Sequence, residues 1–287
     1  MPEMPELQVL AETLDARLAG SVITAGQLVA FSALKTYAPP LEALAGLVVA
    51  GVGRHGKFID VDASGLHLVF HLARAGWVTW HDRVPAGVPR PGRSGLALRI
   101  TLDDGAGFSL TEAGTQRSLA VYVVEDPQGV PGIARLGPEP LSEAFTVDVL
   151  AGILRDAAGS QLKGVLRDQS RIAGIGNAWS DEILHAAKLS PFTPASSLDA
   201  GAIAALHGHI QQVLGDAIAA LRGLELADLK DGKRSGMNVH GRTGQPCPVC
   251  GTTVAEVSFA DSSLQYCPRC QTGGRLLADR RMSRLLK

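Results

Sequence analysis

Four cysteines, the only ones in this 287-residue chain, constrain its fold more than any other feature. They form two Cys-x-x-Cys pairs, Cys247/Cys250 and Cys267/Cys270, with 16 residues between the pairs. This spacing is typical of two knuckles that each turn two thiolates toward one tetrahedral Zn²⁺. Two disulfides are the alternative. However, no secretory signal is recognisable at the start, so we expect a reducing compartment where disulfides do not persist. The pattern predicts a structural Cys₄ zinc ribbon holding one Zn²⁺.

Charge is distributed unevenly along the chain. The formal net charge is −1, yet the segment 233–287 has nine basic and three acidic residues and carries +6. Clustered arginine on a small zinc module is the electrostatic footprint expected for contact with nucleic-acid phosphates. A solvated basic tail without a partner is the alternative. The nine basic residues are Lys233, Arg234, Arg242, Arg269, Arg275, Arg280, Arg281, Arg284 and Lys287.

The first 130 residues read as one helix followed by many short strands. Leu7, Leu10, Leu14 and Leu18 recur at helical spacing, and Gly20 ends that pattern. Short apolar runs separated by polar or Gly/Pro turns then favour an antiparallel sandwich or barrel. The runs are 21–30, 47–52, 57–61, 66–72, 76–80, 96–102, 108–111 and 119–124. We find no apolar run long enough for a transmembrane helix and expect no membrane partner.

The pattern changes after a Pro/Gly-rich linker at 126–140. Helical periodicity marks 145–155, 161–168, 178–187 and 198–222, and a polar loop at 226–236 leads to the zinc ribbon. The fold class is therefore α+β, with an N-terminal antiparallel β-sandwich flanked by helices. We predict a sandwich domain at 1–130, a helical domain at 131–236 and a zinc finger at 237–287.

Several residues are candidates for chemistry or binding. If Met1 is removed, the amine of Pro2 could attack a sugar C1′, with Glu3 as acid/base and Glu6 as a second carboxylate. Most chains that begin Met-Pro-Glu do so without such a role. Gly174 and Gly176 allow backbone turns that can face a phosphate, and Asn177 could cap the next helix.

Three more candidates could have either a structural or a DNA-binding role. The turn at 174–177 could be a plain helix connector, although Arg167 and Arg171 nearby favour DNA contact. Lys57 and His71, at predicted strand edges, are by default a surface lysine and a hydrogen-bonded histidine.

Taken together, these motifs resemble the formamidopyrimidine-DNA glycosylase/endonuclease VIII family over essentially the whole chain. The matching motifs occur in the family's order: Met-Pro-Glu-x-Pro-Glu at the start, Gly-Lys57, His71-Leu-x-x-x-Gly76, Leu136-Gly-Pro-Glu-Pro-Leu141, Asp168 to Asn177, and the Cys₄ ribbon. The resemblance implies a helix-two-turn-helix in the helical domain and DNA in a cleft between the domains. It also implies Pro2 as nucleophile and Glu3 as acid/base in β,δ-elimination. Lys57, His71 and Asn177 would contact phosphates around an extruded nucleotide.

The chain departs from the family pattern in its DNA-contacting loops. Ser262 stands where the zinc finger usually carries an arginine. Arg74 replaces the usual intercalating methionine and could fill the void left by the flipped base. The segment 111–117 replaces the usual Asp-Pro-Arg-x-Phe-Gly loop. We expect a monomeric, cytoplasmic, nucleoid-associated enzyme that acts on double-stranded DNA with damaged bases or abasic sites. The alternatives are a non-catalytic binder of damaged DNA on the same fold, and a zinc-ribbon accessory protein that would leave the first 230 residues unexplained.

Overall fold

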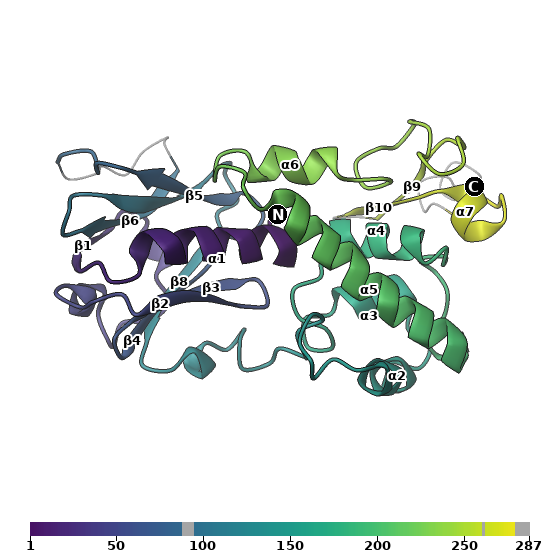
Figure 1. Ribbon diagram of the computed structural model, residues 1–287, viewed down its shortest axis with the longest axis horizontal. Helices are drawn as coiled ribbons and strands as arrows, with labels where there is room; N and C mark the ends of the chain where they lie inside the picture. Colours follow the sequence, from purple (N-terminus) through teal and green to yellow (C-terminus); the bar gives the residue numbers. More distant parts are fainter. Residues whose placement is uncertain (88–94, 260–261, 279–287) are drawn as a thin grey trace. The chain divides into compact units, whose positions relative to one another are not determined.

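The computed structural model describes residues 1–87, 95–259 and 262–278 (Figure 1). The chain divides into two compact units: Met1–Leu136 with Leu221–Lys230, and Gly137–Ala220 with Asp231–Lys287. Within the described ranges, no helix combines the length and the apolar character needed to cross a bilayer. Arg280, Arg281, Arg284 and Lys287 of the basic tail lie outside the described residues.

The first unit is the predicted antiparallel sandwich, which confirms the fold class. One sheet has the strand order β1-β6-β7-β5 and the other β2-β3-β4-β8, and every paired ladder is antiparallel. The strands are β1 (Ile23–Leu28), β2 (Gly51–His55), β3 (Phe58–Ala63), β4 (Leu66–His71), β5 (Gly76–His81), β6 (Leu96–Leu102), β7 (Gly107–Glu112) and β8 (Ala120–Val124). Short 3₁₀ turns η1 (Phe31–Ala33) and η2 (Leu41–Leu44) lie between β1 and β2.

Helix α1 (Met4–Leu18) buries the leucine stripe that the sequence predicted. Leu7, Leu10, Leu14 and Leu18 are all buried, because spacings of three and four residues keep them on one face of the helix. At the same helix, the Asp15 carboxylate accepts from the backbone N–H of Val52 at 2.7 Å and so holds β2. The start of the chain is thereby fixed to the sheet.

The strand predicted at 47–52 is placed wrongly. The β2 ladder begins at Gly51, and residues 46–49 make backbone bonds to 20–23 instead, with an isolated antiparallel bridge between Val22 and Val48. The apolar character of this run reflects the burial of Val49 and does not indicate pairing in a sheet ladder. The linker also differs from a free connection: it forms the turn η3 (Pro127–Gly129), and Val130 and Ile133 pack against Val69.

The second unit is helical and ends in the zinc finger. Its helices are α2 (Val147–Asp156), α3 (Leu162–Arg167), α4 (Asn177–Ala186), the turn η4 (Ala195–Ser197), α5 (Ala200–Leu221) and α7 (Pro268–Thr272), with the hairpin β9 (Ala255–Ser258) and β10 (Ser263–Tyr266). The predicted polar loop at 226–236 is wrong in part, because it contains α6 (Leu229–Ser235). Leu229 is its single buried side chain, so no apolar period reveals this helix in the sequence.

Candidate functional site

The N-terminal candidates lie at the first turn of α1, where they are buried. Glu3 is the residue that caps the helix, and it forms a capping box with Glu6. The backbone N–H of Glu3 donates to Glu6 Oε2 at 2.7 Å, and the Glu3 carboxylate accepts from the backbone of Glu6. Pro2, Glu3 and Glu6 are covered while Met1 is exposed. The capping box holds Glu3 and Glu6 in place at the first turn of α1.

Lys57 and His71 lie close together in the same sheet. Lys57 is in the two-residue turn between β2 and β3, and His71 pairs with Phe58 across the β3/β4 ladder. Burial, assisted by the positive charge of Lys57, lowers the pKa of His71 to about 4. Its Nδ1 accepts from the backbone N–H of Ala73 at 3.2 Å. At neutral pH the ring is therefore neutral and carries its proton on Nε2, where it can donate to an anion.

The lowered pKa of His71 predicts a pH-dependent loss of stability. Between pH 6.5 and 4, His71 is protonated in the unfolded chain but stays neutral in the folded protein. The free energy of unfolding therefore decreases as pH falls through this range. From pH 7 to pH 5 this contribution amounts to about 2 kcal/mol. His71→Gln should remove that share in urea unfolding at the two pH values, and His209→Gln on α5 should not. An unchanged pH dependence in His71→Gln would contradict the assignment.

Arg74 lies exposed in the tight turn between β4 and β5. The turn closes with the N–H of Gly76 donating to the carbonyl of Leu72 at 2.8 Å. A Cβ at Gly76 would lie 2.2 Å from that carbonyl oxygen, so this position requires glycine. The turn projects Arg74 into solvent. Its proposed place beside an extruded nucleotide stays a prediction.

The loop 168–176 is organised by Gln169, which sequence reasoning missed. Its side chain donates to the carbonyls of Arg167 and Ile175 and accepts from the N–H of Gly174. Gly137 packs against this loop so closely that a Cβ would lie 2.5 Å from the Arg171 carbonyl. A glutamine followed by a Gly-rich turn was the available signal. The loop geometry is therefore fixed from within the second unit.

Arg171 and Asn177 are both engaged with protein atoms. Arg171 pairs with Asp168 at 3.3 Å, and Asn177 Nδ2 donates to the Ser263 carbonyl of β10 at 2.8 Å. The residue that caps α4 is Gly176, so the expectation that Asn177 caps this helix is wrong by one position. Asn177 is the first residue of the helix, and its side chain is thereby free to reach the zinc-finger hairpin instead.

A buried ionic network, also missed from the sequence, surrounds α4. Lys163 Nζ lies 2.5 Å from Asp181 Oδ1 and also donates to the Ser180 hydroxyl and the Asn177 carbonyl. Asp181 Oδ2 lies 2.8 Å from His240 Nδ1. The Glu182 carboxylate accepts three backbone N–H groups from residues 238–240. Such a network satisfies its buried charges and ties the entry of the zinc finger to α4.

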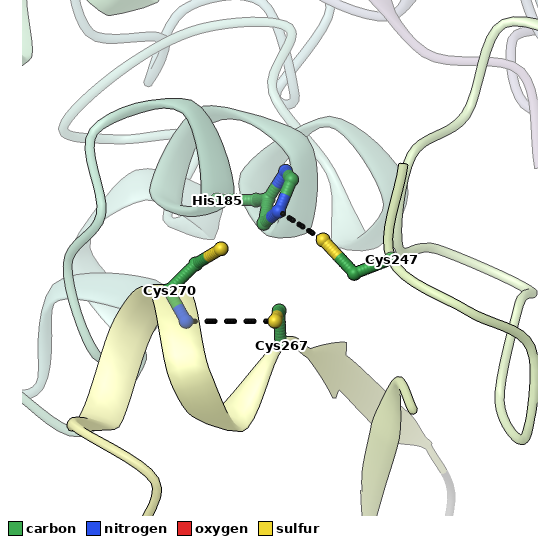
Figure 2. Close-up of side chains that lie close together, drawn as sticks. All are labelled: His185, Cys247, Cys267 and Cys270. Atoms are coloured by element: carbon green, nitrogen blue, oxygen red, sulfur yellow. Dashed lines mark hydrogen bonds between the residues drawn. The ribbon is translucent and has the colours of Figure 1, made fainter. Parts of the chain in front are cut away.

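Three of the four predicted cysteines gather at one point, with an unpredicted histidine. One ligand atom from each of His185, Cys247, Cys267 and Cys270 lies within 4.8 Å of the others (Figure 2). His185 extends from α4, and its Nε2 lies 3.3 Å from Cys247 Sγ. Cys250 Sγ lies 3.4 Å from Cys267 Sγ. All four cysteines are free thiols, so the disulfide alternative is not what the structure contains.

The donor chemistry fits one structural Zn²⁺. Burial raises the pKa of the Cys267 and Cys270 thiols, with the neighbouring cysteines adding to the effect at Cys270. Crowded thiols that resist ionisation in this way become thiolates when a divalent cation is present. Hydrogen bonds from Thr252 lower the pKa of Cys250 to about 6, which favours its thiolate. The cysteine cluster is thus a zinc site.

Comparisons with known proteins match all parts of this architecture. Family descriptions match residues 1–117 as a formamidopyrimidine-DNA glycosylase N-terminal domain and 136–225 as its H2TH domain. Residues 244–273 match a zinc finger found in FPG and IleRS. A formamidopyrimidine-DNA glycosylase from Roseiflexus sp. is 36% identical over 282 residues, which cover 94% of this chain and 100% of the relative. The chain belongs to the formamidopyrimidine-DNA glycosylase family.

Two further similarities support this family membership. An uncharacterized formamidopyrimidine-DNA glycosylase-like protein of Mycobacterium tuberculosis is 57% identical over 159 residues, covering 55% of this chain and 99% of that protein. The structure of MutM in complex with DNA containing carbocyclic 8-oxo-G has a TM-score of 0.80 at 25% identity, covering 94% of this chain and 100% of that chain. The resemblance seen in the sequence and the single zinc site are both confirmed.

Against the family pattern, the altered loop after β7 has its own internal anchor. The buried Glu112 carboxylate accepts from the backbone N–H groups of Ser118 and Leu119, each at 2.9 Å. This closes the segment that replaces the family's Asp-Pro-Arg-x-Phe-Gly loop. Ser262 accepts a backbone bond from Phe259 N–H at the hairpin. The first departure is therefore held by a buried carboxylate, and Ser262 is held by a backbone bond to Phe259.

Proposed function

We propose that this protein is a bifunctional DNA glycosylase and abasic-site lyase of base excision repair, which removes oxidised bases through a covalent intermediate on Pro2. The observation that carries the proposal is the buried Pro2-Glu3 pair held by the capping box at the start of α1. A DNA-binding protein without chemistry has no need of this arrangement. Membership of the glycosylase family and the likeness to DNA-bound MutM support the assignment.

In the proposed reaction the amine of Pro2 attacks C1′ of the deoxyribose. The bond between C1′ and the base breaks, and Glu3 gives a proton to the ring oxygen as the sugar opens. The resulting iminium expels the 3′ phosphate and then the 5′ phosphate by β,δ-elimination. Hydrolysis of the iminium then releases the unsaturated sugar remnant from Pro2, which leaves a gap in the strand. Glu6 acts as a positioning residue, since its carboxylate holds the backbone N–H of Glu3.

The proposed DNA contacts come from both units. In the first unit, Lys57 supplies a cation, neutral His71 donates through Nε2, and exposed Arg74 lies beside the extruded nucleotide. In the second unit, Arg171 and Asn177 contact phosphates near the start of α4. Such contacts position the duplex, and extrusion exposes the base for chemistry. We place the protein in the cytoplasm at the nucleoid, as a monomer with sandwich, helical and zinc-finger domains at 1–130, 131–236 and 237–287.

Borohydride trapping tests the chemistry directly. We expect a reduced covalent adduct with a duplex carrying an abasic site or an oxidised base, and none with Pro2→Gly of confirmed native fold. Intact-mass measurement should find Met1 removed in the active protein, because an acylated proline nitrogen cannot form an iminium. If the unaltered protein from which Met1 has been removed formed no adduct, the proposed enzymatic function would be wrong.

The second candidate, a non-catalytic binder of damaged DNA, is favoured by Ser262 and by the replaced wedge residues. A serine cannot reproduce the charge-assisted phosphate contact of an arginine. This candidate predicts tight binding to an abasic-site analogue without strand cleavage. The same trapping experiment, run beside a binding titration, separates the two.

A further inference from the structure

One face of α4 makes three contacts to the zinc-finger segment. Asn177, Asp181 and His185 are spaced by four residues, so they lie in one stripe along the helix. Asn177 donates to the Ser263 carbonyl, and Asp181 accepts from the backbone N–H of Gln265 at 3.3 Å. His185 ends the stripe at Cys247 Sγ. Figure 2 shows the imidazole projecting from the helix toward that sulfur.

Five potential donors compete for one metal at the end of this stripe. His185, Cys247, Cys267 and Cys270 lie within 4.8 Å of one another, and Cys250 lies 3.4 Å from Cys267. A structural zinc site is tetrahedral and takes four ligands. Either His185 or Cys250 therefore has a role other than ligation.

Hydrogen bonds to the cysteine sulfurs indicate which of His185 and Cys250 is not a zinc ligand. The backbone N–H of Cys270 donates to Cys267 Sγ at 3.5 Å, and Thr252 bonds to Cys250 through both its backbone and its side chain. These are the surroundings of ligating thiolates, since four thiolates around Zn²⁺ leave an excess of two negative charges that N–H donors stabilise. Cys247 is 2% exposed and His185 5% exposed, so solvent is a poor source of such a bond there.

We propose that His185 is a positioning residue of the zinc centre, whose Nε2–H donates to the Cys247 thiolate while the four cysteines bind the Zn²⁺. The bond fixes the rotamer of Cys247 and fastens the first knuckle to α4. It links the metal to the same helix that begins at Asn177. This inference does not depend on the proposed enzymatic function, because its measurements are of metal binding.

Zinc affinity and cobalt spectra of the full chain test the inference. His185→Leu should weaken Zn²⁺ binding by about 10- to 100-fold in competition with a chromophoric chelator, as removal of a bond to a ligand does. His185→Gln keeps a side-chain N–H donor and should bind within a few-fold of the unaltered protein. His207→Leu is the control, because His207 Nε2 donates to the Phe145 carbonyl at 2.6 Å, away from the metal.

Cobalt substitution separates positioning from ligation. The Co²⁺ form of the unaltered protein should show charge-transfer intensity for four thiolates, and His185→Gln should leave that spectrum unchanged. Cys250→Ser should reduce the intensity by one thiolate. A three-thiolate spectrum in the unaltered protein, unmoved by Cys250→Ser, would make His185 a ligand and overturn the proposal. Equal zinc affinity in His185→Leu would also overturn it.

Discussion

Glu3→Gln should lower the rate of base excision by about 10²- to 10⁴-fold, the usual contribution of general acid–base catalysis. Glutamine keeps the volume of Glu3 and an oxygen that can accept from the backbone of Glu6, so the capping box persists. The glutamine amide cannot, however, donate a proton to the ring oxygen of the sugar. The measurement is single-turnover cleavage over a panel of 8-oxoguanine, oxidised-pyrimidine and abasic duplexes.

Glu12→Gln is the matched control for this result. Glu12 lies on the same helix, and its carboxylate forms a two-point contact with Arg222 at 2.7 and 2.9 Å on a partly exposed surface. Losing that pair should leave excision unchanged and alter stability by no more than about 1 kcal/mol. Excision by Glu3→Gln at more than half the unaltered rate would exclude Glu3 as the proton donor.

Lys163→Met should destabilise the second unit by about 3–5 kcal/mol, because it leaves the buried Asp181 carboxylate without its cation. Lys163 and Asp181 are both almost fully covered, and Lys163 donates three hydrogen bonds that methionine cannot make. Urea unfolding followed by circular dichroism measures the loss. Zinc content should be recorded in the same samples, since this network adjoins the zinc finger.

Two further variants serve as controls, one at an exposed ion pair outside this network and one within the network. Arg234→Met breaks a pair with Asp231 in which both side chains are about four-fifths exposed, at 82% and 78%. It should cost between 0 and about 1 kcal/mol. Lys163→Met/Asp181→Leu should be more stable than Lys163→Met alone, because it removes the unpaired charge. A double variant no better than the single one would show that His240 and Gln265 N–H already satisfy Asp181.

Much of the fold was readable from local patterns. The leucines of α1, the alternation of the sandwich strands and the two cysteine pairs each express a short-range rule of spacing. Where a rule had little signal, the prediction failed. Helix α6 buries Leu229 alone, and in the apolar run at 47–50 only Val49 is buried, while Val48 forms an isolated bridge to Val22.

The site was less predictable because its contacts join distant residues. His185 and Cys247 are 62 positions apart, and Lys163 reaches Asp181 and, through it, His240. No spacing rule connects them. A single histidine near the end of the predicted helix at 178–187 was the available hint, and such a histidine is more often hydrogen-bonded within the core. Glu112 and Gln169 similarly form hydrogen bonds with backbone groups that lie close to them only in the folded loops.

The first unit is discontinuous in the chain, and this has a consequence for its synthesis. Besides Met1–Leu136 it includes Leu221–Lys230, where the carbonyl of Leu226 accepts from the indole N–H of Trp77 at 3.1 Å. A nascent chain emerging from the ribosome presents Trp77 long before its acceptor has been made. The first unit therefore lacks its 221–230 segment until residues 137–220 have been translated. A fragment ending at 136 would lack the Leu226 acceptor, so a fragment that also carries 221–230 is expected to be the more stable of the two.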